Sequence, residues 1–598
     1  MFYNKSQIRS MFLLLFFLFF SVILVYSFAG GDGSLGSPYQ ITNCSDLQNM
    51  SFDLSANYTL NNDINCGVAP FNTGTGFKPI GNCTGICTAS GDDYSFNGSL
   101  NGNGFEIQNL FINRSSTDNI GLFGYSIYGD ILNLGLTNVN IIGHDNVGSL
   151  IGYSRFSTIN NTYSILGNVS GRWDVGGLFG ETYRANISYS YTSGVMFGNV
   201  SVGGLAGKVE NGGNIEYSYS SSAITVYQNT GGGLIGHATD YYTRIDNSYA
   251  IGNVNGNGYI GGLIGTNNAN VSNSYATGTM TGNDLIGGLI GYNYGYVNMA
   301  YATGNINGND YIGGLIGISF FGNVDNSYAT GNVIGVNRVG GLVGHMNGEL
   351  NQTYATGFVN GTTNVGGLTG ASFQLVSNSY ATGDVHGVKN VGGLIGFRES
   401  AENTVNSYST GDVYGVVNVG GLVGVNRPDW DNGIIENSYS SSNVNGTENV
   451  GGLVGVNHGF SSGPGYFAII ENSFSTGNVN GVTNVGGLLG RNNNSYANLS
   501  NAYWNNHSGN PSIGIGSDVN AQSTIAVDDN ISYFNYNSPP INLWDLNYWT
   551  ITNSSLPQLT WNYVVSETNN GLASIFPAHS VISIVLILLG VVGFILFN

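Results

Sequence analysis

The chain has 598 residues, of which 94 are glycine, 10 are proline and 8% are charged, and its formal net charge is −20. Helical globular domains contain far more Glu, Lys, Ala and Leu, and disordered chains are rich in charge and poor in aromatic residues, so composition excludes both classes. Nucleic-acid binding is also disfavoured, because phosphate contacts need clustered Lys and Arg. A neutral-polar, β-rich chain remains, and we expect no cofactor apart from calcium.

The N-terminus resembles a secretory signal. Lys5 and Arg9 precede an apolar run over residues 11–28, and Ser27-Phe28-Ala29 fits a small-x-small cleavage site. We therefore predict a signal peptide over residues 1–29. An uncleaved membrane anchor is the alternative. In both cases we expect the rest of the chain to be exported.

Four cysteines follow, all of them before the repeats begin. An even number confined to one exported segment predicts two disulfides. Of the three possible connectivities we favour Cys44–Cys66 and Cys83–Cys87. A zinc site is not expected, because no histidine precedes His144.

The central part of the chain repeats a Gly-Gly-Leu-apolar-Gly block at a shortest spacing of 26 residues. Its leucines are Leu178, Leu205, Leu234, Leu263, Leu289, Leu315, Leu342, Leu368, Leu394, Leu422, Leu453 and Leu488. Two divergent copies precede them at residues 121–124 and 148–152. A propeller blade needs about 40 residues, so the spacing excludes a propeller. No segment has a helical apolar period.

Each copy adds two further blocks, such as Val-Ser-Asn-Ser-Tyr-Ala-Thr-Gly at residues 271–278 and Asn-Val-Ile-Gly at 332–335. Three short extended segments separated by glycine turns describe one coil of a parallel β-helix. The sequence therefore predicts an all-β, right-handed parallel β-helix (a solenoid) of about fourteen coils. The hand follows the general chirality of parallel connections.

Stacked coils place equivalent residues about 4.8 Å apart, so the repeats predict side-chain ladders. One asparagine ladder contains Asn247, Asn273, Asn326, Asn378, Asn406, Asn437 and Asn472, and a second contains Asn364, Asn390, Asn418, Asn449 and Asn484. An aromatic ladder contains Tyr249, Tyr275, Tyr301, Tyr328, Tyr354, Tyr380, Tyr408, Tyr439, Phe474 and Tyr503. The sequence does not decide whether these ladders face inward or outward.

These repeated blocks, Gly-Leu-Val/Ile-Gly with Asn-Ser-Tyr-Ala-Thr-Gly between copies, resemble the GLUG-motif repeats of bacterial and archaeal surface proteins and adhesins. The resemblance covers roughly residues 121–505. It implies an exported adhesive or structural role with few defined activities. Some relatives carry a His-Glu-x-x-His metallopeptidase motif, which this sequence lacks.

The flanking segments complete the predicted organisation. Residues 30–120 form a disulfide-stapled N-terminal cap, 121–505 the repeat solenoid, 506–565 a C-terminal cap and 566–580 a polar spacer. Caps are needed because an open coil edge pairs with other chains.

The C-terminal residues 581–597 are apolar and reach the short limit for a transmembrane helix. We predict a retained transmembrane anchor there, and a lipid-anchor signal is the alternative. Asn-x-Ser/Thr triplets, such as Asn57-Tyr58-Thr59, make glycosylation possible in an exported chain.

Two pairs of acids share repeat positions in consecutive coils: Asp384 with Asp412, and Asp284 with Asp310. A separation near 5 Å would suit a calcium site or a retaining glycosidase. Other coils carry Asn, Thr or Lys at these positions, which is typical of tolerant, solvated turns. Calcium is the candidate ligand, solvated turn acids are the favoured interpretation, and no catalytic residue is assigned.

Aromatic residues outside the repeat pattern fall where coils lengthen, and insertions of solenoids often carry the binding face. The candidate ligand-binding residues are Tyr241, Tyr242, Trp430, Phe460, Tyr466 and Phe467.

We therefore expect a non-enzymatic cell-surface adhesin or envelope stalk, anchored in a membrane with its large N-terminal region outside. Its partners would be extracellular glycans or surface proteins of other cells, and not nucleic acid. A polysaccharide-degrading β-helix enzyme and a purely structural lattice protein are the alternatives. Clustered acids on one face would indicate the enzyme, and self-association without a foreign ligand would indicate the lattice.

Overall fold

The computed structural model describes residues 28–81, 94–399, 403–429, 431–460, 465–519, 522, 524–527, 545–550 and 557–560. They belong to two compact units. Unit 1 is Met1–Thr225 with Leu234–Gly236, and unit 2 is Val226–Gly233 with His237–Asn598.

Regular structure is almost entirely β-strand, which confirms the all-β prediction. The described helices are a short α-helix, α2 (Cys44–Asn49), and a 3-10 turn, η1 (Met50–Phe52). Within the described ranges no helix is long and apolar enough to cross a membrane. The predicted anchor at 581–597, the spacer at 566–580 and nearly all of the predicted signal lie outside those ranges.

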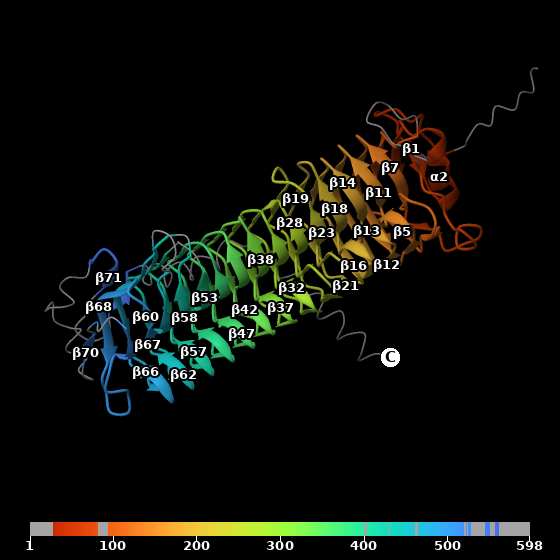
Figure 1. Ribbon diagram of the computed structural model, residues 1–598. Coiled ribbons are helices and arrows are strands. Elements are labelled where there is room, and N and C mark those ends of the chain that lie inside the picture. The colour runs from red at the N-terminus through yellow and green to blue at the C-terminus, as the bar shows by residue number, and fades with distance from the viewer. Residues whose placement is uncertain are drawn as a thin grey trace, which may run out of the picture. The chain divides into compact units, whose positions relative to one another are not determined.

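Unit 1 consists of parallel strands that pair from one coil to the next. One sheet contains β7 (Phe123–Ile127), β11 (Ile151–Arg155), β14 (Phe179–Tyr183) and β18 (Ala206–Glu210), which lie side by side in Figure 1. A second contains β10 (Asp145–Val147), β13 (Trp173–Gly176) and β17 (Val200–Gly203). A third includes β8 (Asp130–Thr137), β12 (Thr158–Ser170), β15 (Asn186–Ser188) and β16 (Tyr191–Gly198). Three sheets joined by coil-to-coil pairing define a parallel β-solenoid.

The same parallel pairing begins inside the segment predicted as a cap. Strand β1 (Tyr39–Ile41) pairs with β2 (Asn57–Leu60), β2 pairs with β4 (Ser99–Asn101), and β4 pairs with β8. The N-terminal segment is therefore built from coils of its own, and strand pairing does not change at residue 120.

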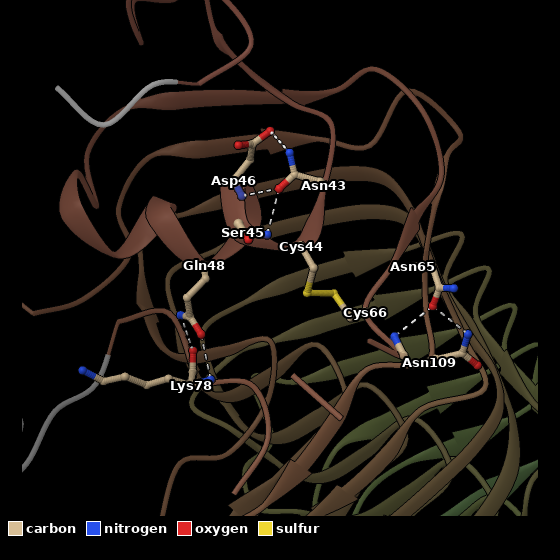
Figure 2. The surroundings of a disulfide bond; sticks show 10 residues. Asn43, Cys44, Ser45, Asp46, Gln48, Asn65, Cys66, Lys78 and Asn109 are labelled. Atoms are coloured by element: carbon tan, nitrogen blue, oxygen red, sulfur yellow. Dashed lines mark hydrogen bonds between the residues drawn. A yellow bond between two sulfur atoms is a disulfide. The ribbon is translucent and has the colours of Figure 1, made fainter. Parts of the chain in front are cut away.

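The predicted Cys44–Cys66 disulfide is present, with the two Cα atoms 5.3 Å apart (Figure 2). It joins the start of α2 to the residue that follows β3 (Ile64–Asn65). Cys83 and Cys87 lie outside the described residues, so their pairing stays a prediction.

Side chains around the disulfide hold α2 in place (Figure 2). The Asn43 side-chain oxygen accepts the backbone N–H groups of Ser45 and Asp46 at 2.9 and 3.0 Å, which is an N-cap. Gln48 forms two hydrogen bonds with the backbone of Lys78, at 2.8 and 2.9 Å.

A representative coil of unit 2 has five short strands. They are β47 (Thr363–Gly366), β48 (Thr369–Ser372), β49 (Val376–Ser377), β50 (Tyr380–Ala381) and β51 (Val385–His386). Each pairs in parallel with its equivalent one coil on, as Val365 does with Val391. Among the described residues, the sheet that contains β48 has fifteen strands, close to the predicted number of coils.

The Val-Gly-Gly-Leu block is a corner between two sheets. Val365 and Leu368 are both fully buried, because the two glycines turn the chain between β47 and β48. A Cβ on Gly367 would lie 2.1 Å from the carbonyl oxygen of Gly393 and 2.9 Å from the Cβ of Ala381. The core is too narrow there for any side chain, which explains the repeated glycine.

The tyrosine ladder faces outward. Along β50, Tyr380 is half-buried and Ala381 is fully buried, and the same alternation recurs in neighbouring coils. From Tyr249 to Phe474 successive ring centroids are 4.7–5.0 Å apart and the planes are 2–5° from parallel. The ring faces are thus covered by one another, and the tyrosines from Tyr249 to Tyr439 are half-buried. Phe474 and Tyr503, at the C-terminal end of the predicted ladder, are fully buried, and Trp549 packs on Phe474 with ring centroids 5.7 Å apart.

Both predicted asparagine ladders mark corners at which the backbone is left-handed. Values of φ are 46–51° for the first ladder and 53–58° for the second. Asparagine tolerates this conformation better than most residues. In the second ladder each amide after that of Asn364 donates to the preceding coil; for example, Asn390 donates to Asn364 at 2.7 Å and Asn418 to Asn390 at 2.8 Å.

Candidate functional site

The acids predicted as calcium candidates do lie in pairs. The backbone N–H of Asp412 donates to Oδ1 of Asp384 at 2.9 Å, and the amide of Asn443 donates to Oδ1 of Asp412 at 2.9 Å. These carboxylates therefore act as acceptors in a corner ladder, much as asparagines do in other coils.

The second pair is arranged in the same way. Asp284 and Asp310 are aligned across strands β32 (Asp284–Gly287) and β37 (Asp310–Gly313). Oδ1 of Asp284 accepts the N–H of Asp310 at 3.3 Å, and Oδ1 of Asp310 accepts the amide of Asn337 at 2.8 Å. In the described part of the chain neither pair has a third His, Cys, Asp or Glu in ligand range. Calcium binding at these pairs stays a prediction.

One group with three donor side chains does occur among the described residues, and the sequence did not indicate it. Ligand atoms of Asp118, His144 and Asp145 lie within 4.8 Å of one another. Nδ1 of His144 is 2.8 Å from Oδ1 of Asp118, and Nε of Arg172 donates to Asp145 at 2.9 Å. A metal ion would have to displace Arg172, so ion pairing accounts for this group as it stands.

Two predicted ligand-binding aromatics, Tyr241 and Tyr242, form an exposed pair in unit 2. Their side chains are 65% and 64% exposed, with ring centroids 4.0 Å apart. Oδ1 of Asp240 accepts the N–H groups of Tyr242 and Thr243 at 2.9 and 3.1 Å. The loop is therefore fixed at its base while both rings remain at the surface.

The insertion after β63 (Val454–Asn457) brings together two further candidates. Phe460 and Tyr466 exchange both backbone N–H···O bonds at 2.8 Å, and their rings are 6.3 Å apart. Phe467 packs on Tyr496 with ring centroids 5.3 Å apart. All three candidates are only half-buried. Trp430 lies outside the described residues.

A charged cluster in unit 1 was missed by sequence reasoning. Tyr153, Glu181 and Lys208 are in register across β11, β14 and β18. Nζ of Lys208 lies 3.3 Å from Oε1 of Glu181 and also pairs with Glu210. Tyr153, Glu181 and Lys208 come directly after the last glycine of a repeat block, and Glu210 comes three residues after it. Only a comparison of these positions from coil to coil could have revealed the cluster.

Burial governs the acids of this cluster. It raises the pKa of Glu181 to about 7 despite the nearby Lys208. It also raises the pKa of Asp174, at the adjoining corner, to about 6, although Lys208 and a hydrogen bond from Ser201 act in the opposite direction.

Asp174 should make unit 1 less stable as pH rises. Its carboxyl group holds a proton in the folded protein at pH values where an unfolded chain has lost it, so its contribution is favourable at low pH and is lost as pH rises to about 6 and above. We expect Asp174→Asn to raise the melting temperature at pH 8 by roughly 2–4 °C and to change it little at pH 4. Calorimetry at both values tests this, and equal shifts at both would contradict it.

The comparisons with known proteins agree with the repeat architecture. A model of the GLUG motif matches residues 198–226, 227–255, 256–281, 308–334 and 446–480. These matches confirm the predicted GLUG-motif repeats.

Two curated relatives match part of the chain. Halomucin of Haloquadratum walsbyi is 39% identical over 125 residues, which is 20% of this chain and 1% of halomucin. A "Putative Gly-rich membrane protein" of Evansella cellulosilytica is 36% identical over 113 residues, which is 18% of this chain and 12% of that protein. The chain thus matches only a small part of either relative.

A solved structure titled as a "putative immunoglobulin A1 protease" from Bacteroides ovatus aligns with 56% of this chain and 80% of its own. The TM-score is 0.30 and the sequence identity 18%, so this similarity carries no argument.

Proposed function

We propose that this chain, which carries GLUG-motif repeats, is a cell-surface protein that presents exposed aromatic side chains for attachment to glycans or to other cells. The observation that carries the proposal is the Tyr241–Tyr242 pair. Its rings are 65% and 64% exposed at an insertion, while their loop is anchored by Asp240. Fixed, exposed aromatic rings bind at low conformational cost.

The repeated tyrosines are less suited to this task. Their faces stack on one another at 4.7–5.0 Å, so a ligand can reach only edges and hydroxyl groups. The ladder stabilises the coils, and ring faces for binding must come from aromatics outside the repeat.

The names of the relatives support a surface location. One is named a halomucin and the other a putative Gly-rich membrane protein. A predicted signal at residues 1–29 and a predicted anchor at 581–597 are consistent with export and tethering.

Removing the tyrosine pair tests the proposal. We expect full-length Tyr241→Ala/Tyr242→Ala to lose at least tenfold in retention on a panel of polysaccharides and cell envelopes, because the exposed surface of both rings is removed. Tyr227→Ala/Tyr414→Ala removes two other exposed rings, 57% and 39% exposed, and should retain binding. Equal retention by both variants and wild type would remove the pair from the attachment site. Self-association of wild type without retention would favour the lattice alternative.

A polysaccharide-degrading enzyme is the second candidate, and the buried acids of unit 1 are what favours it. A carboxyl group whose pKa is raised to about 7, as for Glu181, is suited to act as a general acid. The ion pair of Glu181 with Lys208 argues for a structural role instead. Release of reducing ends that Glu181→Gln abolishes would establish the enzyme.

A further inference from the structure

One corner of unit 1 gathers two arginines among aromatic rings. Arg155 ends β11 and Phe156 follows it; Tyr183 ends β14 and Arg184 follows it. The guanidinium carbon of Arg155 lies 5.1 Å from the ring centroid of Phe156 and 4.5 Å from that of Tyr183. Arg184 lies 5.9 and 5.7 Å from the same two rings. Both cations are thus held by cation–π contacts.

Stacked coils make this corner rigid. The N–H of Tyr128, which follows β7, donates to the carbonyl of Arg155 at 2.9 Å, and that of Phe156 donates to the carbonyl of Tyr183 at 2.9 Å. The rings of Tyr128 and Phe156 stack with centroids 5.0 Å apart and planes 10° from parallel. The aromatic and cationic groups therefore have fixed positions before any ligand arrives.

The backbone at this corner is left-handed, as it is at corners of many other coils. Tyr128, Phe156 and Arg184 have φ values of 58°, 53° and 51°, and Asn211 occupies the same position one coil on with 56°. A bulky residue in this left-handed conformation costs about 1–3 kcal/mol, and asparagine would avoid much of that cost. Three successive coils nevertheless carry large side chains here.

Neither arginine is neutralised by a carboxylate. Among the described residues no ion pair involves Arg155 or Arg184. Nε of Arg155 is buried without a hydrogen-bond partner. The nearest acids along the sheet, Glu181 and Glu210, are paired with Lys208. This corner is therefore a local cationic site on a chain whose net charge is −20.

We propose that the corner formed by Tyr128, Arg155, Phe156, Tyr183 and Arg184 binds polysaccharides whose sugars carry carboxylate or sulfate groups. The guanidinium forks match the oxygens of such anions. Tyr128 is 64% exposed and offers ring surface to the apolar face of a sugar. Nucleic acid fits less well, because the two arginines of this corner are too few for the run of phosphate contacts on which non-specific nucleic-acid binding depends. These residues belong to unit 1, and the Tyr241–Tyr242 pair belongs to unit 2.

The test uses the full-length chain with polygalacturonate, dextran sulfate, neutral dextran and single-stranded DNA as probes. We expect one or both anionic polysaccharides to bind, with affinity falling as salt rises, and neutral dextran not to bind at this site. Arg155→Gln/Arg184→Gln should weaken that binding at least tenfold. Arg244→Gln/Lys389→Gln removes the same two positive charges from exposed positions elsewhere and should weaken it less than twofold.

Several results would overturn the proposal: equal weakening by both double variants, unchanged binding in Arg155→Gln/Arg184→Gln, or tighter binding of DNA than of either polysaccharide. If the Arg155 substitution lowers the melting temperature, binding by the single variant Arg184→Gln tests the proposal instead. Arg184 is exposed, so its replacement should leave the fold intact. A preference for polygalacturonate or for dextran sulfate identifies carboxylate or sulfate as the ligand group. If Arg155→Gln/Arg184→Gln loses this binding but keeps the retention that depends on Tyr241 and Tyr242, the two proposals are distinguished.

Discussion

Leu368→Asp is expected to unfold the coils around it, whereas Asp384→Asn should be nearly neutral. Leu368 is fully buried at the glycine corner, and its coil can bury apolar surface only against the coils on either side. Truncating such a leucine to alanine costs about 2–5 kcal/mol. A carboxylate there adds the cost of an unpaired buried charge, several kcal/mol more.

Asp384 is the matched control because it is exposed and belongs to the same repeat region. Its Oδ1 accepts one N–H from Asp412, and an asparagine oxygen can accept the same bond. Differential scanning calorimetry of the purified full chain would show the contrast. Similar melting of the two variants would contradict the description of Leu368 as a core residue.

The second large effect concerns the N-terminal end of unit 1. Cys44→Ser/Cys66→Ser removes a disulfide that closes a sequence separation of 22 residues. Closing a loop of that length lowers the entropy of the unfolded chain and should raise the free energy of unfolding by about 3 kcal/mol. We expect earlier melting and faster amide exchange in α2 and β1–β2, since the disulfide joins the start of α2 to the residue after β3.

Reduced wild type is the control for that variant. A reductant should bring the wild-type protein and Cys44→Ser/Cys66→Ser to the same melting temperature, because it opens the predicted Cys83–Cys87 bond in both. If the variant melted like oxidised wild type, the disulfide would have no part in stabilising this end.

Much of the fold could be predicted from the sequence, because equivalent positions of successive coils have the same backbone conformation and the same neighbours. Asparagine recurs where the backbone is left-handed, and tyrosine recurs where rings stack on the outer face, so periodicity alone placed both ladders. The sequence did not predict whether these ladders face the core or the solvent. Val365 and Leu368 are three residues apart yet both buried, because two glycines turn a corner between them. Alternation within a single strand cannot indicate that turn.

Buried polar ladders were also missed. Asn426 donates its amide to Asn457 at 2.9 Å, and both residues are fully buried. In sequence they come two residues after Gly-Leu-Val-Gly, and Asn267, Asn293 and Asn492 hold the same position in other coils and are also fully buried. Only the pairing of β58 (Val423–Arg427) with β63 shows that they face the core.

The candidate sites were harder to predict for a related reason. Glu181, Lys208 and Arg184 lie one or four residues after a Gly-Gly-Leu-x-Gly block, at positions where the residue type varies from coil to coil. Departures from a repeat look like tolerated variation in a single sequence. The pairs Asp384–Asp412 and Asp284–Asp310 were correctly placed together, but the sequence could not show that their oxygens accept hydrogen bonds from the next coil.

The central claim is that the protein attaches to surfaces and does not cleave them. The most direct test incubates the purified full chain with a panel of polysaccharides and cell envelopes, and measures both retention and the release of reducing ends. We predict retention without release. Release of reducing ends that Asp174→Asn or Glu181→Gln abolishes would contradict the claim and identify the protein as an enzyme.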